Sequence, residues 1–194
     1  MNVGTKSIFV GAHQCILHPI ALAIAWTRLY GLPLDFRLLI SFAVHDLGYF
    51  GLENTAGKEG DRHPIRGAAI MRMFFGKAWG DFTLYHSRNY ARKRNRPYSR
   101  LAVADKLATT ILPAWLYVPM VCLTGEIDEY MSYTAGKDAS FHSQGAITGD
   151  VWLWHSELCD FLRQWAFDHK DVATPIRVAQ TTPTVLRSTE SPVL

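Results

Sequence analysis

Histidine and aspartate side chains recur over the first 105 residues in an order that could bind metal ions. Imidazole nitrogens and carboxylate oxygens together suit iron, manganese, zinc and cobalt. Each of these residues falls on a different expected helix or helix end, and helical proteins build metal sites from ligands that converge in a bundle interior. The sequence therefore predicts a buried metal site whose ligands are His18, the doublet His45-Asp46, His63, His86 and Asp105.

The apolar surroundings of the two aspartates strengthen this prediction. Asp46 follows the apolar run LLISFAV, and Asp105 lies inside LAVADKLA. Burying an ionised carboxylate is costly unless a positive charge compensates it. A metal ion between these helices would supply that charge.

The elements that must position these side chains are expected to be helices. Gly31 and Pro33 end the first apolar stretch, Pro64 suits the first position of a helix, and Asp35 and Ser99 suit N-caps. Residues 51–62 are rich in glycine and charge and are expected to form a loop, and no segment shows sustained strand alternation. We predict an all-α bundle with helices over 14–30, 34–45, 64–75, 77–92, 100–112, 114–133 and 150–169.

The length of 194 residues and the 48% hydrophobic content fit one packed domain. We expect the metal-binding domain to span 1–135 and a C-terminal loop and helix over 136–170 to pack on it. The Thr- and Pro-rich segment 171–194 is expected to be an extended or disordered tail.

The rest of the composition indicates in which compartment the protein is expected and which partners it is expected to lack. Cys15, Cys122 and Cys159 are odd in number and form no CxxC pair, which suits a reducing cytoplasm. We expect no signal peptide and no membrane span, because there is no run of about 18 apolar residues. The net charge of +3 is too small to indicate a nucleic-acid partner. The sequence gives no indication of oligomeric state.

Basic residues cluster after His86, and two interpretations of the cluster stay open. It could clamp phosphate, since guanidinium groups bind phosphate in a fork, or it could be a solvated helix end. The first interpretation is favoured for Arg88, and more weakly for Arg62, Arg66 and Lys58, which flank His63. The cluster comprises Arg88, Arg92, Lys93, Arg94, Arg96 and Arg100.

Four segments of this chain resemble the HD superfamily of metal-dependent phosphohydrolases, in its dinuclear subgroup. They are HPIALAIAW, FAVHDLG, HPIRGAAI and LAVADKLA. The spacing from His86 through the basic cluster to Asp105 is similar to that of bacterial dinucleoside-tetraphosphate hydrolases. The resemblance covers about residues 12–112 and leaves 114–194 without a counterpart.

The resemblance implies an HD-domain helical bundle with a C-terminal helical extension and two divalent ions. Iron or manganese is favoured, and zinc, cobalt, nickel or magnesium would also suit. Asp46 would bridge the ions, and Asp46 and Arg88 would act in catalysis. The substrate would be a phosphate ester or anhydride of a nucleotide or other small phosphorylated metabolite. One ion would be held by His18, His45, Asp46 and Asp105, and the second by Asp46, His63 and His86.

Other functions remain open at this point. Some HD proteins with this ligand order are diiron oxygenases that cleave C–P or C–C bonds, and a degenerate domain could bind nucleotide without turnover. The ADKL segment and the basic cluster favour phosphate chemistry. Tyr49 stands where some dinuclear members carry a lysine, which argues against cyclic dinucleotides. Four histidines outside the pattern are interpreted as surface or structural residues: His13, His142, His155 and His169.

Overall fold

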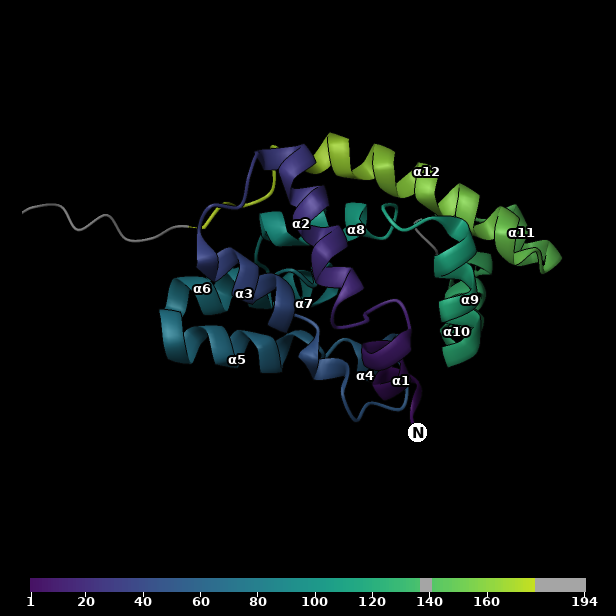
Figure 1. The fold of residues 1–194 in the computed structure, drawn as a ribbon, viewed down its shortest axis with the longest axis horizontal. Helices are drawn as coiled ribbons and strands as arrows, with labels where there is room; N and C mark the ends of the chain where they lie inside the picture. The colour runs from purple at the N-terminus through teal and green to yellow at the C-terminus, as the bar shows by residue number, and fades with distance from the viewer. Residues whose placement is uncertain (137–140, 177–194) are drawn as a thin grey trace, which may run out of the picture.

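The computed structural model describes residues 1–136 and 141–176, and these residues form helices. One isolated bridge joins Ser99 to Thr174, and the described residues contain no strand. The all-α prediction is therefore confirmed. Figure 1 shows α5 (Pro64–Phe75) and α12 (Val151–His169) on opposite sides of the molecule, with α2 (Leu17–Tyr30) and α8 (Arg100–Ala108) between them.

The main core surrounds α8, which is buried along almost its whole length. It packs against α2 on one side and α12 on the other, and α6 (Lys77–Leu84) also contacts it. The α3 helix (Phe36–Val44) packs between α2 and α5. Large side chains with at most 1% exposure fill this core: Leu22, Phe42, Met71 and Leu101.

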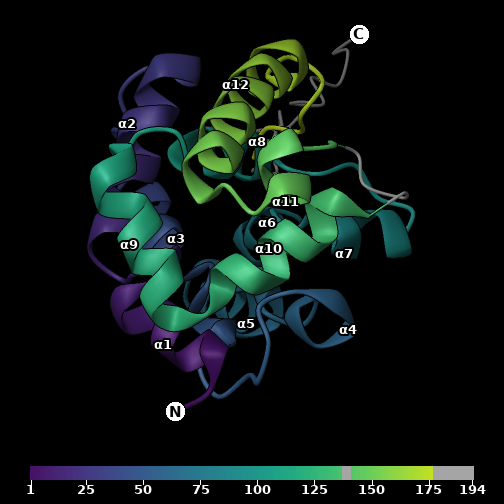
Figure 2. The same cartoon turned by 90° about the vertical axis from the view of Figure 1, so that its right-hand side faces the viewer.

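The C-terminal third of the chain adds a second layer with a smaller core around Tyr117 and Trp154. Figure 2 shows α9 (Ala114–Thr124), α10 (Glu126–Ala135) and α11 (Gln144–Thr148) on the face toward the viewer. The N-terminal helix α1 (Val3–Val10) packs against α9 and against the short 3-10 helix η1 (Leu47–Tyr49). The N-terminal helix therefore joins this second layer to the segment that follows α3.

Two long helices predicted from the sequence are each broken into two. The 77–92 helix ends at Leu84, and α7 (Arg88–Lys93) begins after Ser87, whose hydroxyl accepts a hydrogen bond from the Tyr90 amide. The 114–133 helix ends at Gly125, which has a φ of +84° and lets the chain turn into α10. Both breaks come from local capping that the apolar pattern does not reveal.

Shorter elements also differ from the sequence predictions. The helices α1, α4 (Gly57–Gly60) and α11 were not predicted, and α4 lies in the segment expected to be a loop. Asp35 caps α3 through the Arg37 amide as expected. Ser99 does precede α8, but its side chain makes no capping hydrogen bond. Its backbone carbonyl instead accepts a hydrogen bond from the Ala102 amide at 3.0 Å.

The predicted tail begins as an ordered segment against the core. Thr174 donates its amide to the Tyr98 carbonyl and accepts the Arg100 amide at 3.0 Å each, and Ala173 is buried. The rest of that prediction, residues 177–194, lies outside the described residues. Within the described ranges, no helix is long and apolar enough to cross a membrane.

Two glycines allow backbones to approach where the predicted ligands lie. A Cβ atom on Gly48 would lie 1.8 Å from the carbonyl oxygen of His63. A Cβ atom on Gly67 would lie 2.3 Å from the Val44 carbonyl oxygen and 2.9 Å from the Cα of His45. These contacts fix the start of α5 against the end of α3, so only glycine fits at either position without a shift of the backbone.

The variant Gly67→Ala is expected to push α5 away from His45 and to lower the free energy of unfolding by ~1–3 kcal/mol, the usual cost of overpacking. Denaturant unfolding measures this loss. Ile65→Ala, at an exposed position of the same helix, is the control and should cost less. Equal stabilities for the Gly67→Ala variant and the unaltered protein would contradict the close approach.

Candidate metal centre

The fold brings the six predicted ligands together in two groups that share Asp46. His18 comes from the first turn of α2, and the His45-Asp46 doublet directly follows α3. His63 precedes α5, and His86 lies between α6 and α7. In each group the candidate ligand atoms all lie within 4.8 Å of one another. The groups are His18, His45, Asp46 and Asp105, and Asp46, His63 and His86.

The first group is compact and buried. The Nε2 atom of His18 lies 3.1 Å from Asp105 Oδ1 and 3.5 Å from Asp46 Oδ2. The Nε2 atom of His45 lies 3.1 Å from Asp46 Oδ2 and 3.6 Å from Asp105 Oδ1. These two imidazoles and two carboxylates therefore face a common point.

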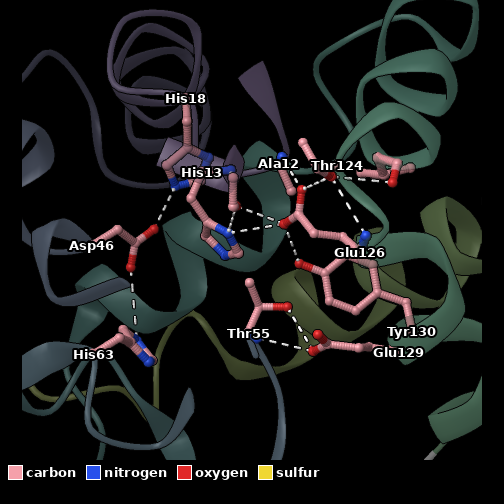
Figure 3. Close-up of polar contacts among 12 residues, drawn as sticks. Ala12, His13, His18, Asp46, Thr55, His63, Thr124, Glu126, Glu129 and Tyr130 are labelled. Carbon is pink, nitrogen blue, oxygen red and sulfur yellow. Dashed lines mark hydrogen bonds and ion pairs between the residues drawn. The ribbon is translucent and has the colours of Figure 1, made fainter. Parts of the chain in front are cut away.

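The second group faces the other oxygen of Asp46. Asp46 Oδ1 lies 3.3 Å from His86 Nε2 and 3.7 Å from His63 Nε2. Figure 3 shows the Asp46 carboxylate between His18 and His63. One carboxylate oxygen thus faces each group, which is the arrangement that a bridging carboxylate needs.

Backbone carbonyls orient three of the four imidazoles. In each, the Nδ1 atom lies within hydrogen-bond distance of the carbonyl three residues earlier: Phe42 for His45 at 3.0 Å, Gly60 for His63 at 2.6 Å and Thr83 for His86 at 2.6 Å. A proton on Nδ1 leaves the Nε2 lone pair pointing into the centre. Such a contact to the remaining ring nitrogen is typical of metal-binding histidines.

The donor set fits a cation. His63 Nε2 and His86 Nε2 lie 2.9 Å apart, and two lone pairs at that distance repel each other unless a positive charge lies between them. Burial and the neighbouring imidazole of His86 lower the pKa of His63 to about 3, so His63 itself does not carry that charge at pH 7. Asp46 Oδ2 is buried without a hydrogen-bond partner among the described residues. A metal ion in each group would satisfy these atoms.

The first group also requires positive charge. Burial alone would raise the pKa of Asp46, but the neighbouring His45 and His13 imidazoles hold it well below its usual range. Burial lowers the pKa of His45, but the Asp46 and Asp105 carboxylates raise it to about 10. Lys106 compensates part of the charge on Asp105, and the remaining negative charge of the group needs a further positive charge, which a proton on His45 or a metal ion can supply.

Tyr49, three residues after Asp46, lies against the centre. Its ring stacks on His63 with centroids 4.4 Å apart and an interplanar angle of 9°. It contributes an aromatic wall and no positive charge. Positive charge comes instead from Lys106, whose ammonium group lies 2.7 Å from Asp105 Oδ2.

The basic residues predicted to bind substrate lie in different surroundings. Lys58 and Arg62 are exposed, and Arg66 is exposed and donates to the Phe50 carbonyl at 2.7 Å. Arg88 is half-buried, with its guanidinium 4.4 Å from the centre of the Trp165 ring. None of these four side chains forms a hydrogen bond with a candidate metal ligand in the described part of the chain.

Three residues around the centre were missed by the sequence interpretation. His13 lies beside His18, with ring centroids 5.9 Å apart, and pairs with the fully buried Glu126 through Ser7. His13 was interpreted as a surface or structural histidine, and Glu126 lies in the region without a counterpart. The only sequence signal was the position of His13 five residues before His18.

No family model, curated protein or solved structure matches this chain.

Replacing Asp46 with alanine is expected to remove metal from both groups, because its two oxygens serve one group each. His63→Ala should reduce the metal content by about half, since the first group keeps all of its ligands. Elemental analysis of the purified, metal-loaded variants measures this, with Asp128→Ala on the exposed face of α10 as the control. Full metal content in the Asp46→Ala variant would contradict a shared carboxylate, and a metal-free parent protein would refute the centre itself.

Proposed function

We propose that this chain is a dinuclear, metal-dependent phosphohydrolase of the HD type, acting on a phosphate ester or anhydride of a nucleotide or other small phosphorylated metabolite. The observation that carries the proposal is the division of the Asp46 carboxylate between two groups of histidines. A single ion would not need two such groups. Two adjacent cations are the usual device for displacement at phosphorus.

The residues of the chain would hold the metal ions in place and balance their charge. Two divalent ions, iron or manganese by preference, would supply Lewis acidity for the attack of water on phosphorus and would neutralise charge on the phosphoryl oxygens. The backbone carbonyls behind His45, His63 and His86 hold those imidazoles in one orientation. The site therefore needs little rearrangement when the substrate binds.

The HD resemblance supports this proposal through the order of the ligands along the chain. The all-helical fold and the convergence of the four resembling segments on one centre agree with it. The basic residues near His86 favour an anionic substrate, which argues against an oxygenase that cleaves a C–C bond of an uncharged compound.

A phosphate-release assay with the manganese- or iron-loaded protein tests the function. Nucleotides, dinucleotides and small phosphate monoesters form the substrate panel. We expect release from at least one class, and loss of release after a chelator removes the metal. Product formation that depends on oxygen and releases no phosphate from any ester would refute the hydrolase and point to the oxygenase chemistry.

Arg88 is the best-placed basic residue for a phosphate that extends away from the ions. It lies two residues after His86 and, with Arg92, Arg96 and Tyr98, lines a cavity of about 530 Å³. No carboxylate pairs with Arg88 among the described residues, and burial lowers its pKa. A half-buried cation without a counter-charge favours the binding of an anion.

Arg88→Ala is expected to reduce kcat/KM by the equivalent of ~1.5–3 kcal/mol, the scale of a hydrogen bond to a charged group. Metal content should stay unchanged, because Arg88 is not a ligand. Steady-state kinetics on the substrate found in the release assay gives the measurement. Arg94→Ala is the matched control, since Arg94 is exposed and lies over the Tyr90 ring. A normal kcat/KM in the Arg88→Ala variant would show that Arg88 does not bind the substrate.

A further inference from the structure

A second group of ionisable side chains lies beside the candidate metal centre and contributes no ligand to it. Glu126, the first residue of α10, is completely buried, and His13 between α1 and α2 keeps 17% of its side-chain surface exposed. Figure 3 shows His13 between the Asp46–His18 pair and Glu126. His13 therefore pairs with Glu126 of α10 while its ring lies beside that of His18.

The Glu126 carboxylate is fully hydrogen-bonded without His13. Burial would raise the pKa of Glu126, but hydrogen bonds with His13, Ser7 and Thr124 lower it to about 2. A Cβ atom on Gly11 would lie 2.0 Å from Glu126 Oε2, so the backbone is fitted closely around this group. Its donors are the Ser7 hydroxyl at 2.6 Å, the Tyr130 hydroxyl at 2.9 Å, the Thr124 hydroxyl at 2.7 Å and the Ala12 amide at 3.0 Å.

The same contacts fix the orientation of His13. Because the Ser7 hydroxyl donates to Glu126, its oxygen is left to accept from His13 Nδ1, which lies 2.7 Å away. Nδ1 also lies 3.3 Å from Glu126 Oε1. Nδ1 therefore carries a proton, and Nε2 on the opposite edge of the ring has no hydrogen-bond partner among the described residues. A carboxylate behind Nδ1 stabilises a positively charged imidazolium, in which Nε2 is also a donor.

His13 lies beside the first ligand group and lines the same small cavity as His18, His45 and Asp46. Its ring lies 5.9 Å from His18 of the first group and 4.2 Å from the Tyr49 ring, centroid to centroid. Tyr49 in turn stacks on His63 of the second group. A purely structural role does not account for this, because Glu126 is satisfied by other donors and His13 keeps one nitrogen uncommitted.

We propose that His13 contacts the phosphoryl group of the substrate through Nε2, and that Ser7 and Glu126 are positioning residues that act through His13. The proposal rests on the proposed function, since it names a substrate contact at that same centre. The ligand class is a phosphoryl oxyanion, which accepts the hydrogen bond from His13 while the metal ions bind its other oxygens. The C-terminal extension, which begins at α9 after the segments that carry the ligands, thereby contributes to the site through Glu126.

Binding of inorganic phosphate to the metal-loaded protein tests the contact without requiring turnover. Isothermal titration calorimetry of His13→Gln and His13→Ala should show a dissociation constant raised about 10- to 150-fold, the effect of losing a hydrogen bond to a charged group. Metal content should be unchanged, since His13 is not a ligand. His142→Ala, which alters an exposed histidine far along the chain, should bind phosphate like the parent protein.

The positioning role has its own readout. Glu126→Gln should weaken phosphate binding in the parent protein but add little in the His13→Ala background, because its effect passes through His13. A purely structural Glu126 would weaken binding equally in both backgrounds.

Three outcomes would overturn the proposal: unchanged phosphate affinity in both His13 variants, loss of metal from them, or no phosphate binding by the metal-loaded parent protein. The absence of phosphate release from every substrate, with phosphate binding still dependent on His13, would instead defeat only the proposed hydrolysis.

Discussion

The burial of Asp46 is the constraint on which the rest of this molecule depends. A carboxylate inside a helical bundle is costly unless positive charge and hydrogen-bond donors surround it. Here four imidazoles from separate parts of the chain face its two oxygens within 3.7 Å. Placing them there requires the start of α2, the end of α3, the start of α5 and the end of α6 to meet. The tight approaches at Gly48 and Gly67 follow from that requirement, since any side chain would separate those segments.

The C-terminal extension supports the centre from the other side. The helix α10 begins with Glu126, which binds the Ala12 amide and Ser7, and one turn later Glu129 accepts the amides of Thr55 and Ala56 at 2.9 and 2.8 Å. One helix therefore holds the segment before His18 and the segment that leads to His63 (Figure 3). Removing the extension would remove both carboxylates and release the two ligand-bearing segments that they hold, so the geometry of the centre depends on the extension.

The sequence predicted the ligand types and the helical class because both leave local marks. An ionisable residue such as Asp105 inside an apolar run is conspicuous, and helix ends such as Gly31 and Pro64 are chemically distinctive. The breaks at Ser87 and Gly125 were missed although each carries a local signal, a serine N-cap and a glycine C-cap. The pairing of His13 with Glu126 could not be predicted, because it joins residues 113 positions apart through tertiary packing and neither has a distinctive neighbour.

The structure also divides the basic cluster after His86, for which the sequence left two interpretations open. Lys93 pairs with Asp61, and Asn89 donates to the other oxygen of the same carboxylate at 3.2 Å. These contacts attach α7 to the segment that precedes His63, so this part of the cluster has a structural role. Arg88, Arg92 and Arg96 line the cavity instead and have no carboxylate partner among the described residues. Because the tether holds α7 beside the His63 segment, it also fixes the place of those cations relative to the second ligand group. The two interpretations therefore apply to different residues of one cluster. The residues with structural contacts hold in place the residues that are proposed to bind an anion.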